Sequence, residues 1–372
     1  MILKNIFAVT PDGVVKTDVE VTDGMIGKIG KTEKEGLDCT GRYAFPGFVD
    51  THVHGAYGTE FASENEEFDK GLIKEAEKGI TSVCATVRCL PLEDTHKAIR
   101  NIVKEHKRSP KGASLRGIHL EGPFVSPKYI GSMNPSWLSS PSPDEIKRLY
   151  DLSEGLLKII TIAPELDNAI ETIKTAVSLG VRVSIGHSAA DYETACRAYE
   201  AGASQITHTF NAAVPFHHRS PGFLGFGLTE ENVKCEAICD LVHLDKAAIK
   251  LIYLAKGDGK INMISDSGVF SGLGDGEYVI AGKKRTVKNG VCTVEGGKIA
   301  GSCYTLHQGV KNLLDLGYSP VSVSRMASLN PAETLGIADF TGSLEEGKRA
   351  DIAVLDENYD NVLTLVGGEI YE

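Results

Sequence analysis

Residues 43–54 read YAFPGFVDTHVH, an apolar run that ends in two histidines. Such a run is typical of a strand that is buried on both faces. Seven similar runs follow, separated by segments with the period of an amphipathic helix: ITSVCATVR (80–88), SLRGIHLEG (114–122), LLKIITIAPE (156–165), VRVSIGHS (181–188), SQITHTFNA (204–212), VKCEAICD (233–240) and INMISDS (261–267). Eight strands alternating with helices favour an α/β fold of the (β/α)₈ TIM-barrel type over a doubly wound sheet.

The two ends of the chain follow a different pattern. Residues 2–10 and 13–24, and again 349–356 and 361–372, alternate apolar and polar side chains between turn residues. This alternation predicts half-buried antiparallel strands, and we expect one sheet with pieces from both termini. Turn residues also interrupt the strand–helix alternation around 270–300, which predicts a β-hairpin insertion at the mouth of the barrel.

Composition excludes several classes of protein. The formal net charge of −11 argues against a nucleic-acid-binding protein. No apolar stretch approaches the length of a membrane span, and the first residues do not resemble a secretory signal. The eight cysteines form no C-x-x-C pair, which is typical of reduced thiols, so we expect a cytoplasmic protein.

His52 and His54 end the first barrel strand. Residues i and i+2 of a strand point to the same side, so both imidazoles should face the C-terminal mouth, where catalytic residues of this fold lie. An isolated His-x-His pair is more often two hydrogen-bonded core histidines. Here, however, Glu121, His187 and His208 end the third, fifth and sixth strands in the same way.

Asp266 ends the eighth strand and completes a set of six polar residues at strand ends. Buried ionisable groups without partners are costly, and a divalent metal supplies the missing partner. Imidazoles with carboxylates suit one or two ions of Zn, Fe, Mn, Co or Ni, with hydrolysis as the reaction class. Asp266 is predicted to be a ligand, a proton shuttle or both. Asp50 shares the face of the histidines but is expected to be structural.

These motifs together resemble the amidohydrolase superfamily, and in particular its N-acetylglucosamine-6-phosphate deacetylases. The most specific motifs are a glutamate in HLEGPF on the third strand and THTFNAA downstream. The resemblance runs through PGFVDTHVHG (46–55), HLEGPF (119–124), TIAPE (161–165), GHSAADY (186–192), THTFNAA (207–213), RSPG (219–222), ISDS (264–267), AGS (300–302), NPA (330–332) and GSLEEGKRADIAVLD (342–356).

The resemblance implies a barrel over 45–339 joined to a small β-sandwich domain built from 1–44 and 340–372. It implies that Glu121, His187 and His208 hold a metal shared by all members, and that His52 and His54 hold a second one. A metal-bound hydroxide would attack the acetamide carbonyl of N-acetylglucosamine 6-phosphate. Asp266 would act as general base and then general acid, so that acetate and glucosamine 6-phosphate leave.

The resemblance also implies a homodimer in which a residue of one subunit reaches the substrate phosphate of the other. Arg219 and His243 match the phosphate-contacting residues, and Asn211 with Ala212 match a substrate-binding pair. Further stretches of the sugar pocket would include Ser132, Asp240, Ala300, Gly301 and Ser302. Met133 stands where the family commonly has a histidine. The substrate could therefore be N-acetylgalactosamine 6-phosphate or an unphosphorylated acetamido sugar.

Two other functions are compatible with the same fold. Another amidohydrolase could act on a cyclic amide or an N-acyl amino acid, and many of those carry a carboxylated lysine on the fourth strand. In this chain Lys158 lies at the start of that strand rather than at its end. A scaffold without activity is the second alternative, but such a protein would be expected to lack metal ligands.

Overall fold

The computed structural model describes residues 1–372 except 64–67, 281–282, 295–296 and 298. Its central sheet has eight parallel strands that follow one another in chain order. They are β6 (Phe48–Val53), β9 (Ile80–Arg88), β10 (Ser114–Glu121), β11 (Leu157–Ile162), β12 (Arg182–Ile185), β13 (Gln205–Ile206), β14 (Lys234–Ile238) and β15 (Ile261–Ile264). All eight lie within the runs predicted from the sequence.

The sheet closes between β6 and the residues that follow β15. The Asp266 N–H donates to the His52 carbonyl over 2.9 Å, and the His54 N–H donates to the Ser267 carbonyl over 2.9 Å. Val53 and Ser267 form a parallel bridge at the same place. The (β/α)₈ barrel is therefore confirmed, and its closure brings the first and last strand ends together.

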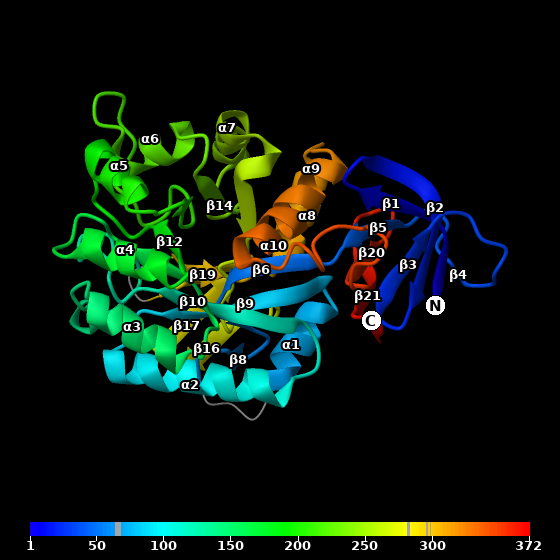
Figure 1. Cartoon of the computed structure of the whole chain (residues 1–372), viewed down its shortest axis with the longest axis horizontal. Coiled ribbons are helices and arrows are strands. Elements are labelled where there is room, and N and C mark those ends of the chain that lie inside the picture. Colours follow the sequence, from blue (N-terminus) through cyan, green and yellow to red (C-terminus); the bar gives the residue numbers. More distant parts are fainter. Residues whose placement is uncertain (64–67, 281–282, 295–296, 298) are drawn as a thin grey trace.

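A helix follows each barrel strand and packs on the outside of the sheet (Figure 1). These helices are α1 (Phe68–Ala76), α2 (Leu92–Arg108), α3 (Pro143–Leu152), α4 (Ala169–Ser178), α5 (Tyr192–Glu200), α6 (Gly222–Thr229), α7 (Lys246–Lys256) and α8 (Leu306–Asp315). The chain then continues through α9 (Pro320–Ser324), η3 (Arg325–Leu329) and α10 (Asn330–Leu335). Short elements in the connections are β7 (Gly55–Ala56), β8 (Thr59–Glu60), η1 (Pro135–Trp137) and η2 (Asp258–Lys260).

The barrel strands are apolar because both of their faces are covered. Every residue of β6 and β14 is buried, as is every residue of β9 except Arg88. Side chains such as Phe48, Ile118 and Ile160 pack with helix residues such as Ile99 in one large core. This rigid core holds the strand ends, and therefore any side chains placed on them, in fixed relative positions.

The two termini lie in a small β domain beside the barrel (Figure 1). Its eight-stranded sheet has the order β22-β21-β20-β5-β1-β2-β3, and β4 pairs with β1. The strands are β1 (Ile2–Thr10), β2 (Gly13–Thr22), β3 (Met25–Ile29), β4 (Leu37–Asp38), β5 (Tyr43–Pro46), β20 (Ile352–Leu355), β21 (Asn361–Val366) and β22 (Glu369–Tyr371). Its own core includes Leu3, Ile6, Val19, Ile352 and Val354.

The segment expected to form a hairpin contains four antiparallel strands: β16 (Gly276–Ile280), β17 (Lys283–Lys288), β18 (Val291–Thr293) and β19 (Ile299–Ser302). Ser302 of β19 forms a parallel bridge with Ser267, so this sheet joins the mouth of the barrel. Within the described residues, no helix combines the length and apolar character that crossing a membrane requires.

Candidate active site

The six polar residues predicted at strand ends lie together at one end of the barrel. Glu121 is the last residue of β10, while His187, His208 and Asp266 each lie two residues beyond β12, β13 and β15. These three residues have φ angles of 48°, 26° and 49°. Residues other than glycine rarely adopt positive φ, and such strain is typical of functional sites. The backbone thus turns sharply where each side chain enters the site.

Glu121, His187 and His208 form the tightest group. Glu121 Oε1 lies 2.9 Å from His187 Nε2 and 3.1 Å from His208 Nε2. The two Nε2 atoms are themselves 3.0 Å apart. His187 Nδ1 donates to the Tyr129 carbonyl over 2.8 Å, so Nε2 of the neutral ring carries a lone pair into the group. Three atoms of ligand type therefore face one point.

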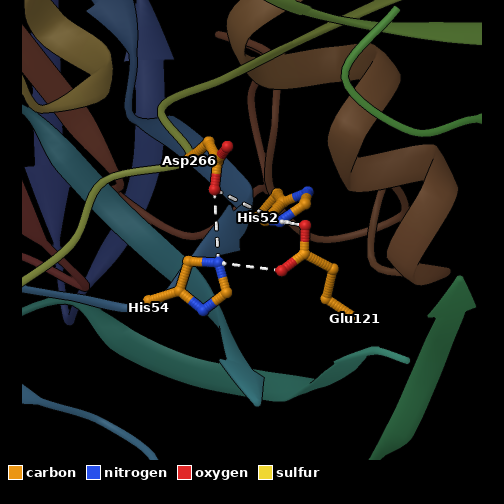
Figure 2. Close-up of side chains that lie close together, drawn as sticks. All are labelled: His52, His54, Glu121 and Asp266. Atoms are coloured by element: carbon orange, nitrogen blue, oxygen red, sulfur yellow. Dashed lines mark ion pairs between the residues drawn. The ribbon is translucent and has the colours of Figure 1, made fainter. Parts of the chain in front are cut away.

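His52, His54 and Asp266 form a second group that shares Glu121, as Figure 2 shows. Asp266 Oδ1 lies 3.5 Å from His52 Nε2 and 3.2 Å from His54 Nε2. Glu121 Oε2 lies 3.4 Å from His54 Nε2, and Glu121 Oε1 lies 3.6 Å from His52 Nε2. Glu121 thus lies between the two groups, in the position of a carboxylate that could bridge two ions.

The charged groups of this site shift one another's pKa values. Burial alone would raise the pKa of Glu121, but its hydrogen bonds to His187 and His208 hold this pKa well below its usual value. Burial would likewise raise the pKa of Asp266, but His52 and His54 lower it to about 2. Burial would lower the pKa of His52, but Asp266 and Glu236 raise it well above its usual value. The carboxylates therefore require positive charge beside them.

A divalent cation fits this donor set. His52 Nε2, which faces Glu121 and Asp266, is buried without a hydrogen-bond partner among the described residues, and the Nε2 atoms of His187 and His208 lie 3.0 Å apart. Lone pairs that face one another at about 3 Å repel unless a proton or a cation lies between them. Nitrogen and carboxylate ligands without cysteine suit a first-row transition metal with an open position rather than a closed structural zinc site.

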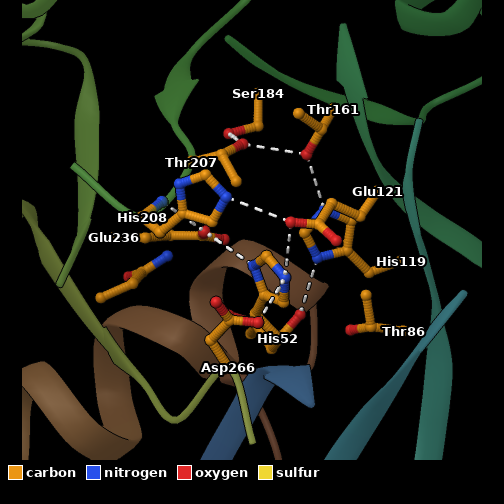
Figure 3. A network of polar contacts seen from close by, with 12 residues as sticks. His52, Thr86, His119, Glu121, Thr161, Ser184, Thr207, His208, Glu236 and Asp266 are labelled. Carbon is orange, nitrogen blue, oxygen red and sulfur yellow. Dashed lines mark hydrogen bonds and ion pairs between the residues drawn. The ribbon is translucent and has the colours of Figure 1, made fainter. Parts of the chain in front are cut away.

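A buried polar layer lies beneath the site (Figure 3). Glu236 Oε2 lies 3.1 Å from His52 Nδ1, and His119 Nε2 lies 2.9 Å from Thr161 Oγ1. The sequence interpretation missed both residues. His119 comes two positions before Glu121 and shares its face of β10, while Glu236 is a charge within an apolar run. Both positions could therefore have been identified from the sequence. Asp50 accepts from the His52 and Ser265 N–H groups, as a structural residue would.

Asp240, His243 and Ser302 form a second polar cluster next to Asp266. Asp240 Oδ2 lies 2.7 Å from His243 Nδ1 and accepts from Ser302 Oγ over 3.1 Å. The Ser302 N–H in turn donates to the Asp266 carbonyl over 2.9 Å. Burial would lower the pKa of His243, but Asp240 raises it. The cluster can therefore present a cationic imidazole to an anionic part of a substrate.

Other predicted substrate residues border the same site. The Asn211 N–H donates to the His208 carbonyl over 2.8 Å, and Ala212 follows with a φ of 45°. Gly301, with a φ of 74°, lies beside the Asp266 carbonyl, and Ala300 precedes it on β19. Ser132 lies in an exposed loop whose Gly131 approaches His187 Cε1.

Arg219 is the remaining residue that was predicted to bind phosphate. It lies in an exposed loop, residues 215–220, where its guanidinium is 2.9 Å from His218 Nε2. No hydrogen bond or ion pair joins Arg219 to His243 in the described part of the chain. Phe216 in the same loop is 53% exposed. Within the described residues, the loop therefore makes no polar contact of this kind with the cluster that Arg219 was expected to complete.

Comparisons with known proteins agree with this geometry. A model of the Amidohydrolase family matches residues 43–370. N-acetylglucosamine-6-phosphate deacetylase of Bacillus subtilis (strain 168) is 34% identical over an alignment of 383 positions, covering 100% of this chain and 96% of the relative. N-acetylgalactosamine-6-phosphate deacetylase of Escherichia coli O157:H7 is 32% identical, covering 91% of this chain and 90% of the relative.

A solved structure gives the same result. It is a variant of N-acetyl-D-glucosamine-6-phosphate deacetylase from Mycobacterium smegmatis, in complex with N-acetyl-D-glucosamine-6-phosphate. It superposes with a TM-score of 0.93 at 29% identity, covering 100% of this chain and 99% of that chain. Together with the family match over most of the sequence, this establishes that the chain belongs to the amidohydrolase family.

Proposed function

We propose that this chain is a metal-dependent hydrolase that removes the acetyl group from N-acetylglucosamine 6-phosphate, yielding acetate and glucosamine 6-phosphate. The observation that carries the proposal is the convergence of Glu121 Oε1 with the Nε2 atoms of His187 and His208, all within 3.1 Å of one another. The names of the relatives support the choice of substrate, because several are deacetylases of this sugar phosphate.

In this proposal Glu121, His187 and His208 hold one divalent ion, and His52 with His54 supply ligands for a second. Zn and Fe are the first choices, with Mn, Co and Ni also compatible with the donor set. A bound ion would lower the pKa of water to around 7 and polarise the acetamide oxygen.

Asp266 is the proposed proton carrier. Its carboxyl group is ionised at neutral pH because His52 and His54 lower its pKa to about 2 against the effect of burial. It accepts a proton from water as the water oxygen bonds to the acetamide carbon. It then delivers that proton to the sugar nitrogen as the C–N bond breaks, so that a neutral amine and acetic acid form, and the acid loses its remaining proton to solvent as acetate.

The proposed substrate phosphate is bound at the edge of this site by His243, with help from Asn211 and Ala212. The support is the position of the Asp240–His243–Ser302 cluster, one hydrogen bond away from the Asp266 backbone. Asp240 favours the charged form of His243, as a phosphate partner requires. Asp240, Ala300, Gly301 and Ser302 would line the sugar pocket.

A second substrate is favoured by one observation. Met133 occupies the position where the family commonly has a histidine, and methionine cannot donate a strong hydrogen bond. A contact to a sugar hydroxyl would then be lost, and one relative is named as an N-acetylgalactosamine-6-phosphate deacetylase. We therefore keep N-acetylgalactosamine 6-phosphate as the alternative substrate.

We also propose a cytoplasmic homodimer in which Arg219 of one subunit reaches the phosphate of the other. The exposed loop over 215–220 supports this, because it carries Arg219 together with a half-exposed apolar side chain, Phe216. Arginine binds phosphate well through its planar, bidentate group. All eight cysteines are free, which suits a reducing compartment.

The test is acetate release from a panel of substrates by the metal-loaded protein. We expect turnover of N-acetylglucosamine 6-phosphate, and little release from free acetamido sugars, N-acetyl amino acids or hydantoins. Arg219→Ala should raise KM for the phosphorylated sugar far more than for free sugars. Absence of acetate release from every acetamido sugar phosphate would refute the proposal, and equal damage to free sugars would refute the role of Arg219.

A further inference from the structure

Glu236 is a fully buried carboxylate on β14, inside the barrel and directly below the rim. Its relative exposure is 0%, and it contacts two of the proposed metal ligands through one oxygen (Figure 3). Glu236 Oε2 accepts from the backbone N–H of His208 over 3.1 Å and lies 3.1 Å from Nδ1 of His52. Neither the proposed mechanism nor the family resemblance uses this residue.

We propose that Glu236 is a positioning residue for the metal site, which holds His52 in the tautomer that presents Nε2 to the ion and fixes the backbone of His208. A histidine binds a metal through one ring nitrogen, and the hydrogen bond made by the other nitrogen sets which one is available. A proton on His52 Nδ1, donated to Glu236, leaves the lone pair on Nε2, which lies 3.6 Å from Glu121 Oε1.

The neighbours of Glu236 show that it acts as an acceptor. Glu236 Oε1 accepts from Gln205 Nε2 over 2.7 Å, and Gln205 Oε1 accepts from Asn262 Nδ2 over 3.1 Å. Asn262 thereby orients the Gln205 amide with its NH₂ group toward Glu236. Since the His208 backbone can only donate, both oxygens of Glu236 meet donors, and His52 Nδ1 is left to supply the proton.

Glu236→Gln is the sharpest substitution, because it preserves shape and replaces one acceptor by a donor. In the present arrangement the new NH₂ group faces either the NH₂ group of Gln205 or the His208 N–H and His52 Nδ1, which are all donors in this proposal. Zinc affinity should be measured by competition with a chromophoric chelator. We expect it to fall by about 10- to 100-fold, the usual effect of removing an outer partner of a metal-binding histidine.

Glu75→Gln is the matched control. Glu75 on α1 is also fully buried, and neither of its carboxylate oxygens has a hydrogen-bond partner within the described residues. The same substitution there should leave zinc affinity within twofold of wild type. Equal affinities for wild type and Glu236→Gln, or an equal loss in Glu75→Gln, would overturn the positioning role.

A measurement on the wild-type protein does not depend on whether a variant folds. In ¹⁵N-labelled, zinc-loaded protein, we expect a slowly exchanging ring N–H signal from His52 Nδ1 that is absent in His52→Asn. A His52 ring without a proton on Nδ1 would overturn the inference. The inference rests on the proposed metal site, yet the two can fail separately: wild type that binds no zinc contradicts the site, whereas unchanged binding by Glu236→Gln contradicts only the role of Glu236.

Discussion

The small β domain and the barrel rim both bury carboxylates, but they compensate the charge in different ways. In the β domain, Asp18 is 1% exposed and accepts from the N–H groups of Asn5 and Thr32 over 2.9 and 3.0 Å. The ammonium groups of Lys4 and Lys31 lie 3.0 and 3.4 Å from its oxygens. The chain itself thus supplies Asp18 with all the donors that a carboxylate needs.

At the rim, Glu121 and Asp266 face imidazoles rather than ammonium groups. His52 Nε2 lies 3.6 Å from Glu121 and 3.5 Å from Asp266, and it makes no hydrogen bond to the described residues. The difference separates a structural cluster from the proposed metal site. A carboxylate whose hydrogen bonds are all made within the chain stabilises the fold. A cluster whose ligand atoms face one another without donors between them is suited to bind an ion. Four predictions test this contrast.

Asp266→Asn should have the largest effect. An amide cannot accept the proton from water, so kcat should fall by about 10²- to 10⁴-fold, the usual contribution of a general acid–base group. Metal analysis of the same sample should still find at least one ion per chain, because Glu121, His187 and His208 are intact. A kcat within tenfold of wild type would contradict the assigned role.

Metal binding at the rim should raise the free energy of unfolding. Zinc at 100 times its Kd should raise the free energy of unfolding by about 2.7 kcal/mol, since it binds the folded state. Glu121→Gln should abolish most of this gain because Glu121 is shared by both ligand groups. Thermal melts with and without zinc measure the effect, and a full gain in Glu121→Gln would exclude this site.

Asp18→Asn should destabilise the protein without changing zinc affinity. Losing a buried acceptor of two N–H groups should cost about 1–3 kcal/mol in urea unfolding. Burial alone would raise the pKa of Asp18, but the Asn5 N–H and Lys4 hold it well below its usual value. This stabilisation is therefore present above pH 4 and is lost as pH falls further. The variant should show a flatter pH dependence below pH 4, and a curve parallel to wild type would contradict this account.

Lys174→Ala should have the smallest effect. Lys174 pairs with Glu171 on α4 over 2.7 Å, but the two side chains are 56% and 65% exposed. Exposed pairs of this kind contribute about 0.2–0.5 kcal/mol because water and salt screen them. Urea unfolding should place the variant within that range of wild type. A loss as large as that of Asp18→Asn would show that burial is not what distinguishes the two ion pairs.

Much of the fold and of the candidate site could be predicted from local sequence patterns. The eight barrel strands lie where their apolar runs are, and Glu121, His187, His208 and Asp266 follow from their places at strand ends. The insertion was predicted less completely, as one hairpin where four strands occur, because its strands are short and partly polar. The exposed position of Arg219 could not be predicted, because a motif match does not show whether the rest of the fold covers a side chain.

The sequence by itself determined the barrel, the β domain from both ends and the six candidate residues, because strand periodicity and strand ends are properties of neighbouring residues. Only the tertiary structure decided that Glu236 meets His52 across 184 positions of the chain. It also decided that Asp240 meets Ser302. The first contact depends on barrel closure and on the stagger between strands, which determine which inward side chains share a layer. The second depends on the bridge that joins β19 to the mouth of the barrel. No local pattern encodes either arrangement.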